Sequence, residues 1–258
     1  MNVIIITGAS SGIGKEFALQ MDAAFSNVDE FWLVARSRDK LKETAAAMEH
    51  KTRILAMDIT KDAQLERLED TLTEKNAVVR MLINCAGYGL MGSFEKQNRE
   101  EMLGMIRLNC EALTNLTHRV IPFMRRGSRI IQLASSAAFV PQPDFAVYAA
   151  SKAYVLSFSR AIGKELSEKG IYVTAVCPGP VRTPFFDIAE KTGTTLAIKK
   201  YTFVSPKRVA ALALKDSYRR RAMSVCSIPI KGFLGLTKFV PHEIILEAMM
   251  LLKKKGFY

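Results

Sequence analysis

The cysteines and histidines of this sequence are few and scattered. Four cysteines lie far apart, with no C-x-x-C pair, at positions 85, 110, 177 and 226, and three histidines are isolated, at positions 50, 118 and 242. These spacings match neither a disulfide framework nor a metal-binding motif. We therefore expect no disulfide and no metal site.

A secretory leader is also not expected. A strand-like run, residues 2–6, begins directly after Met1 and leaves no room for a basic segment, an apolar segment and a cleavage site. No Pro/Ser-rich linker, low-complexity tract or fixed-period repeat divides the chain. With 258 residues, 49% of them apolar, the chain can bury a full core, which excludes disorder and fibrous repeats. We expect one globular unit in the cytoplasm.

Acidic residues are scarce in the last quarter of the chain. The whole sequence has 37 Lys and Arg against 25 Asp and Glu, a net charge of +12. Residues 199–258 alone hold 13 basic and 3 acidic residues. Such asymmetry indicates nucleic acid, an anionic membrane surface or a solvated basic face. The sequence has no recognition motif or stacking platform for nucleic acid, so we expect none to be bound.

Short apolar runs alternate with longer amphipathic stretches. The runs are residues 2–6, 31–35, 53–57, 80–84, 129–134, 171–176 and 223–228. Most are apolar without alternation, which suits strands buried on both faces and joined by right-handed helical crossovers. The sequence therefore predicts an α/β fold, a doubly wound, Rossmann-like parallel sheet of seven strands in a single domain.

A glycine-rich turn follows the first strand. It reads Thr7-Gly8-Ala9-Ser10-Ser11-Gly12-Ile13-Gly14 and precedes a helix expected to begin near Ile13. Glycines permit a tight turn and close backbone approach, so that a pyrophosphate can rest on the free N–H groups at the start of the helix. This position predicts a dinucleotide site.

The residues after the second strand indicate which dinucleotide binds. An acid at this point accepts a hydrogen bond from the ribose 2′-hydroxyl, whereas a basic residue pairs with a 2′-phosphate. Here the strand ends at Ala35 and is followed by Arg36-Ser37-Arg38, with no acid before Asp39. The Arg36 guanidinium can hold a phosphate with two hydrogen bonds, and the Ser37 hydroxyl adds a donor. We predict NADP(H) as the cofactor.

A second group of polar residues surrounds the start of a long helix that runs toward Lys169. Tyr148 and Lys152 are four residues apart, which places them on one face of a helix. Ser135 lies thirteen residues before Tyr148, at the end of the fifth strand. The carboxyl ends of parallel strands face the ligand crevice, so these side chains are expected to meet there.

Together these motifs resemble the short-chain dehydrogenase/reductase family. The resemblance covers residues 1–228 and also rests on Asp58, Asn84-Cys85-Ala86-Gly87, Asn109 and Pro178-Gly179-Pro180-Val181-Arg182-Thr183. The family usually has asparagine where Cys85 stands. The resemblance implies an oxidoreductase that transfers hydride between nicotinamide and a carbonyl or alcohol, and a homodimer or homotetramer.

The resemblance also implies residue roles. The catalytic residues would be Asn109, Ser135, Tyr148 and Lys152. Tyr148 would transfer the proton, helped by Lys152, which stabilises the phenolate and binds the nicotinamide ribose. Ser135 would steady the substrate oxygen, and Asn109 would keep a water that links Lys152 to solvent.

For the cofactor, the resemblance places Asp58 at the adenine amino group, Asn84 and Gly87 at the adenosine ribose, and Val181 and Thr183 at the nicotinamide carboxamide. The full set of expected cofactor-binding residues is Gly8, Ser10, Ser11, Gly12, Ile13, Gly14, Arg36, Ser37, Asp58, Ile59, Asn84, Ala86, Gly87, Tyr148, Lys152, Pro178, Gly179, Val181 and Thr183.

Two adjacent serines compete for the catalytic position. Counting forward from Arg129 at the start of the fifth strand, and back from Tyr148, both lead to Ser135. Ala134 then replaces the serine that usually precedes it in the family. We assign the role to Ser135 and expect Ser136 to be a turn residue.

Two segments lie outside these motifs. Residues 178–204 form an irregular stretch that we interpret as a functional lid. Residues 229–258 form a basic, amphipathic extension of the catalytic domain 1–228, with a helix expected at 242–255. No apolar stretch of the extension approaches the roughly 20 residues that a helix needs to cross a bilayer. Two hypotheses remain for residues 230–255: a dimer-forming or site-covering helical pair, which we favour, and peripheral contact with an anionic membrane.

The sequence thus predicts an NADP(H)-dependent enzyme acting on the CH–OH or C=O group of a partly apolar small molecule. The alternative is a catalytically silent NADP-binding protein that acts as a sensor or scaffold. The presence of Asn109, Ser135, Tyr148 and Lys152 favours the enzyme.

Overall fold

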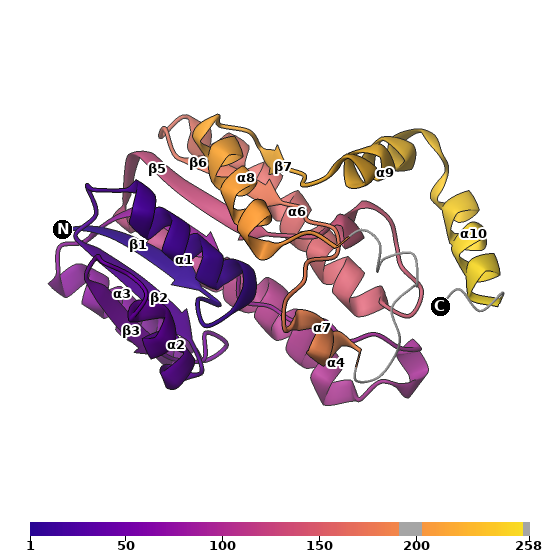
Figure 1. The fold of residues 1–258 in the computed structure, drawn as a ribbon, viewed down its shortest axis with the longest axis horizontal. Coiled ribbons are helices and arrows are strands. Elements are labelled where there is room, and N and C mark those ends of the chain that lie inside the picture. Colours follow the sequence, from indigo (N-terminus) through magenta and orange to yellow (C-terminus); the bar gives the residue numbers. More distant parts are fainter. Residues whose placement is uncertain (191–202, 255–258) are drawn as a thin grey trace.

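The seven apolar runs form one parallel β-sheet. The computed structural model describes residues 1–190 and 203–254. All strand pairs are parallel, in the order β3-β2-β1-β4-β5-β6-β7 (Figure 1). The predicted doubly wound, Rossmann-like sheet is confirmed. The strands are β1 (Asn2–Thr7), β2 (Glu30–Ala35), β3 (Thr52–Ala56), β4 (Val78–Asn84), β5 (Met124–Leu133), β6 (Tyr172–Val176) and β7 (Met223–Ser224).

Helices cover both faces of the sheet, and this explains why the strands lack polar alternation. Alternate residues of β1 enter opposite cores, Ile4 and Ile6 on one face and Val3 and Ile5 on the other. The first core includes residues of α1 (Gly12–Ala24), α2 (Arg38–Ala45) and α8 (Pro206–Tyr218). The second includes residues of α3 (Asp62–Glu74), α5 (Leu113–Val120) and α6 (Ala146–Ser167).

Shorter elements connect the strands and the longer helices, and all but η3, which directly precedes β5, lie near the carboxyl ends of the strands. They are the 3₁₀ turns η1 (Phe94–Lys96), η3 (Ile121–Phe123) and η4 (Ser136–Phe139), the π-helical segment η2 (Arg107–Ala112), and the helices α4 (Arg99–Ile106) and α7 (Phe185–Ala189). Helix α7 belongs to the stretch 178–204 that we interpreted as a lid, of which residues 191–202 lie outside the described part of the chain. The two ends of this stretch are joined by a bridge between Val181 and Val204.

The last strand is shorter than the sequence indicates. The run 223–228 contributes only Met223–Ser224, because β6 ends at Val176, which pairs with Ser224. The chain then turns at Ser227, with a φ of 94°, and Pro229 lies in the first turn of α9 (Ile228–Phe239). Proline suits the first turn of a helix but cannot donate to a sheet, so these residues leave the sheet.

One face of α9 packs on the domain. Ile230, Phe233 and Leu234 contact a buried cluster that includes Phe139, and the ring centroids of Phe139 and Phe233 are 6.3 Å apart. Ile230 also covers Gly179, where a Cβ atom would lie 2.7 Å from the isoleucine side chain. The extension therefore supports the segment that follows β6.

The final helix, α10 (His242–Lys254), lies beyond α9, away from the sheet (Figure 1). Ile245 is buried, and the Lys253 ammonium lies 2.5 Å from a carboxylate oxygen of Asp144. Within residues 1–190 and 203–254, no helix is long and apolar enough to cross a membrane. The division of the chain at residue 228 stays a prediction, although α9 begins there.

We predict that residues 229–258 are required for stability. Cutting the chain after Ile228 should expose the cluster under α9 and cause aggregation or loss of activity, because large apolar patches associate. A matched pair tests the same point without truncation. Phe233→Ala should lower the thermal midpoint, whereas Phe239→Ala, on the exposed side of the same helix, should not. A soluble, fully active truncated chain or equal midpoints would contradict this role.

Candidate active site

The glycine-rich turn connects β1 to α1 at the carboxyl edge of the sheet. Gly8 and Gly12 have φ values of 67° and 54°, which residues other than glycine rarely adopt. A Cβ atom on Gly14 would lie 2.3 Å from the carbonyl oxygen of Gly8, so the helix could not approach the turn with a larger residue there. Each of the three glycines is therefore required by the local geometry, and the first turn of α1 stays open to a ligand.

A cavity of about 920 Å³ runs from this turn to Tyr148. It lies where β1 is flanked by β2 and β4, the point at which the strand order reverses and where ligands bind in such sheets. Apart from Asn84 and Asn109, every predicted site residue lines it. These residues are Gly8, Ser10, Ser11, Gly12, Ile13, Gly14, Arg36, Ser37, Asp58, Ile59, Ala86, Gly87, Ser135, Tyr148, Lys152, Pro178, Gly179, Val181 and Thr183.

Asn84, which we expected in the cofactor site, does not line the cavity. Its side chain is buried in the sheet, where Nδ2 donates to Thr117 Oγ1 at 3.0 Å and to Gln132 Oε1 at 2.9 Å. The expected place of Asn84 at the adenosine ribose stays a prediction, which its side chain, turned to these two partners, does not support. The residue ends β4, and these two hydrogen bonds direct its side chain toward β5 and α5 rather than into the cavity.

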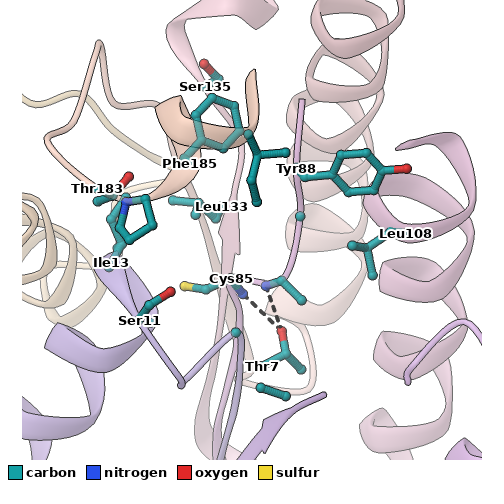
Figure 2. Close-up of a pocket in the computed structure, with 18 of the residues that line it drawn as sticks. Thr7, Ser11, Ile13, Cys85, Tyr88, Leu108, Leu133, Ser135, Thr183 and Phe185 are labelled. Atoms are coloured by element: carbon teal, nitrogen blue, oxygen red, sulfur yellow. Dashed lines mark hydrogen bonds between the residues drawn. The ribbon is translucent and has the colours of Figure 1, made fainter. Parts of the chain in front are cut away.

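Thr7 fixes the end of β4, a role that we did not predict. Its hydroxyl oxygen accepts hydrogen bonds from the backbone nitrogens of Cys85 and Ala86, each at 3.1 Å (Figure 2). A Cβ atom on Gly8 would lie 2.9 Å from the Ala86 nitrogen, so the two segments are in close contact. These contacts involve only the backbone at position 85, which explains why cysteine fits where the family has asparagine.

Basic side chains follow β2 along the cavity. Arg36, Ser37 and Lys40 line it, whereas Asp39 does not and instead lies 3.7 Å from Lys42. Burial acts to raise the pKa of Asp58, but hydrogen bonds from Thr60 and the charge of Arg36 outweigh it and hold that pKa below its ordinary value. This end of the cavity is therefore suited to a phosphate near Arg36.

Tyr148 is held between two aromatic rings. The ring centroid of Phe145 lies 4.3 Å from that of Tyr148, and that of Phe185 lies 5.3 Å away. Gly89 also packs on this ring, since a Cβ atom there would lie 2.6 Å from Tyr148 Cδ2 and 3.0 Å from the Phe185 ring. The orientation of the phenol is thus set by packing on several sides.

Lys152 lies one helical turn after Tyr148 on the same face of α6. Its ammonium group donates to the carbonyl oxygen of Leu133 at 2.7 Å and lies 5.7 Å from the Tyr148 ring centroid. Ser135, which follows β5, caps η4 and accepts a hydrogen bond from Ala137 N at 3.1 Å. The predicted meeting of the serine, tyrosine and lysine at one edge of the sheet is present.

Burial controls the protonation of these groups. It raises the pKa of Tyr148 to about 12, while hydrogen bonding with Ser135 acts in the opposite direction. It lowers the pKa of Lys152 to about 8. Both shifts favour the neutral form, which burial stabilises relative to the charged form. At neutral pH the phenol therefore keeps its proton.

Asn109 lies behind the cavity rather than in its wall. It belongs to η2, and its amide binds the backbone of Tyr88, accepting at 3.1 Å and donating at 2.9 Å. It also donates to Ser151 Oγ at 3.0 Å, and Ser151 donates to the carbonyl oxygen of Tyr148 at 2.7 Å. Asn109 thereby joins the loop after β4 to the helix that carries Tyr148. π-Helical segments often occur at functional sites.

The thiols near Lys152 are not activated. Burial raises the pKa of Cys85 and of Cys177 to about 12, despite the opposing charge of Lys152. Burial also raises the pKa of Cys110. A thiol is a nucleophile only as the thiolate, so these cysteines are packing residues.

Comparison with known proteins places this geometry in a family. Residues 2–192 match the model of the short chain dehydrogenase family. The chain is 36% identical over 184 residues to a very-long-chain 3-oxoacyl-CoA reductase from Phaeosphaeria nodorum. That match covers 67% of this chain and 52% of the relative, so the chain spans about half the length of that protein.

Solved structures agree with the fold. A short-chain dehydrogenase from Sphingobium yanoikuyae in complex with NADPH has a TM-score of 0.77 and 29% identity, covering 93% of this chain and 97% of that one. A 3-ketoacyl-(acyl-carrier-protein) reductase from Brucella melitensis complexed with NADH has a TM-score of 0.75, with 87% and 96% covered. At 23% identity, the second likeness concerns the fold alone.

The parallel sheet and the cavity at its carboxyl edge define a Rossmann-like α/β protein. The chain belongs to the short-chain dehydrogenase family. The prediction of an oxidoreductase of this family is therefore confirmed.

We predict that Gly89 positions Tyr148. Gly89→Ala would place a methyl group against the ring, so that Tyr148 or Phe185 must move. We expect turnover to fall at least about tenfold, since small misplacements of a reacting group have large effects on rate. Turnover is measured beside cofactor affinity, which should change little. Gly232→Ala is the control, because a Cβ atom there meets no atom within 4 Å. Equal turnover in the two variants would refute this role.

Proposed function

We propose that the protein is an NADP(H)-dependent oxidoreductase that transfers hydride between nicotinamide and the carbonyl or alcohol group of a partly apolar small molecule. One observation carries the proposal: Tyr148, Lys152 and Ser135 line the same cavity as the glycine-rich turn and Arg36. A hydride donor bound along this cavity would meet its substrate beside a buried phenol.

The charge of the cavity supports NADP(H). Among the described residues that line it, Asp58 is the one acid, against five basic residues: Arg36, Lys40, Lys61, Arg107 and Lys152. Arg36 and Lys40 follow β2, where a 2′-phosphate would lie, and paired charges near a phosphate strengthen its binding. The structural relative from Sphingobium yanoikuyae is a complex with NADPH.

The cavity wall also fits the remainder of the cofactor. The pyrophosphate would rest on the amides of Ser11 to Ile13, where Gly8 and Gly12 leave the backbone open. Asp58 and Ile59 would hold the adenine, Ala86 and Gly87 the ribose, and Val181 and Thr183 the carboxamide. When bound, the nicotinamide supplies or accepts the hydride.

The residues of this chain provide the proton and hold the substrate oxygen. Tyr148 keeps its proton at neutral pH and can donate it to the oxygen as negative charge develops there. The Ser135 hydroxyl oxygen accepts a hydrogen bond from Ala137 N, so the hydroxyl proton of Ser135 is available for the substrate oxygen. Lys152 stabilises the phenolate formed after transfer, and Asn109 fixes the helix that carries both residues.

The wall beyond Tyr148 indicates the substrate class. It is formed by Met91, Phe145, Phe185, Phe186 and Ile188, so an apolar group would lie next to the reacting carbonyl. Since the fungal relative is named a very-long-chain 3-oxoacyl-CoA reductase, 3-oxoacyl thioesters belong in the first assays. An NADPH-oxidation screen over these, aldehydes, ketosteroids, quinones and sugars tests the function. Cofactor binding without turnover on any of them would favour a silent sensor or scaffold.

A homodimer or homotetramer and a cytoplasmic location also stay predictions.

Arg36 should determine the cofactor preference. NADPH is expected to bind at least about tenfold more tightly than NADH, a difference of about 1.4 kcal/mol, and Arg36→Asp should reverse the order. Titration of both cofactors against both proteins measures this. Arg38→Asp, two residues away and outside the cavity wall, is the control and should keep the preference for NADPH. Equal wild-type affinities for the two cofactors would rule out the assignment.

Tyr148 should be essential for turnover but not for cofactor binding. Tyr148→Phe removes only the hydroxyl group, so nearly all turnover should be lost while NADPH affinity changes little. Lys152→Ala should reduce both. Tyr154→Phe is the matched control, because that hydroxyl lies on the same helix and contacts Thr114 outside the cavity. A Tyr148→Phe enzyme that kept about a tenth of the rate or more would exclude the proton-transfer role.

A further inference from the structure

The C-terminal helices carry a second apolar surface, which does not contact the domain. We define the outer face as Ile228, Leu236 and Phe239 of α9 with Ile244 and Leu251 of α10. Ile228 and Phe239 are 85% and 88% exposed, and Ile244 and Leu251 are 58% and 59% exposed. Exposed apolar residues that cluster on one surface mark an interaction site.

Helical spacing separates this surface from the packed one. Ile230, Phe233 and Leu234 face the domain. Ile228 and Phe239 are eleven residues apart, which is close to three full turns, and lie roughly opposite Phe233 on the same helix. The contacts that α9 makes with its own domain therefore do not account for the outer face.

Lysines flank the outer face. Lys231, Lys238 and Lys254 are exposed, and α9 contains no acidic residue. On α10, Glu243 and Glu247 border Ile244 and Leu251 together with Lys254, so the purely basic border of the outer face belongs to α9. An apolar stripe bordered by lysines is the pattern of helices that lie in the headgroup region of anionic membranes.

The charge also disfavours a second copy as the partner. An isologous contact through the outer face would bring the Lys231 and Lys238 of one copy toward those of the other. An anionic surface instead attracts these residues, as well as the whole chain with its net charge of +12.

We propose that the outer face docks on an anionic lipid surface, with α9 and α10 lying along it. Phe239, Ile228 and Leu251 enter the boundary between headgroups and acyl chains, while Lys231 and Lys238 contact lipid phosphates. The inner face of α9 keeps its contact with Gly179, which lines the cavity. The sequence left site covering and membrane contact as alternatives, and the proposal assigns them to opposite faces of one helix.

Flotation of the full-length chain with vesicles tests the proposal. The protein should float with phosphatidylglycerol/phosphatidylcholine vesicles and not with phosphatidylcholine alone, and high salt should release it. Phe239→Ser and the double variant Lys231→Glu/Lys238→Glu should each reduce the bound fraction at least about tenfold. Ile106→Ser, also at an exposed apolar position, and Lys164→Glu/Lys169→Glu, with the same charge change, should stay within about twofold.

Fluorescence quenching by brominated lipids tests which face enters the bilayer. The native Trp32 is fully buried, so lipid cannot reach it. Phe239→Trp should be quenched on anionic vesicles, whereas Tyr154→Trp, an exposed aromatic position on α6, should not.

Two results would overturn the proposal. One is wild-type protein that stays unbound to anionic vesicles at low salt, or that binds equally well after Lys231→Glu/Lys238→Glu. The other is a wild-type oligomer that Phe239→Ser converts to monomer without any vesicle binding, which would identify the outer face as an interface between copies. Neither readout depends on enzyme activity, so failure here is distinguishable from failure of the proposed reaction.

Discussion

The site depends on the close contact between the glycine-rich turn and the end of β4. The Thr7 hydroxyl accepts hydrogen bonds from the backbone N–H groups of Cys85 and Ala86. At Gly8 the two segments are so close that no side chain would fit between them. Because β1 lies between β2 and β4, this contact fixes one wall of the cavity at the point where the strand order reverses. A ligand lying across the carboxyl end of β1 reaches the ends of both neighbouring strands, and thereby Arg36 and Gly87.

Opposite electrostatic conditions hold at the two ends of this cavity. Near Arg36 and Lys40 the side chains are exposed and charged, which suits a phosphate. Near Tyr148 the rings of Phe145 and Phe185 bury the phenol, and burial lowers the pKa of the neighbouring Lys152 to about 8. The same burial that orients Tyr148 thus also further stabilises its protonated form.

Local sequence patterns were sufficient for the sheet and for most of the cavity wall. The apolar runs located every strand, and Arg36, Ser135 and Tyr148 lie where the strand ends and helix spacing place them. Contacts between distant segments were not accessible in this way. The hydrogen bonds of Thr7 need β1 and β4 as neighbours, and the inward direction of Asn84 follows from its contacts with Thr117 and Gln132.

The extension shows the same limit at the scale of a helix. Periodicity in residues 228–254 reports amphipathic character but cannot say which apolar residues the domain covers. In α9 the side chains of Ile230 and Phe233 pack on the domain, whereas those of Ile228 and Phe239 stay exposed and can contact another partner. A helix that is apolar on two sides stays stable in water only if each side finds a partner or if the exposed area is small. Since Lys231 and Lys238 oppose self-association, an anionic surface would satisfy both the exposed apolar residues and the charges of α9.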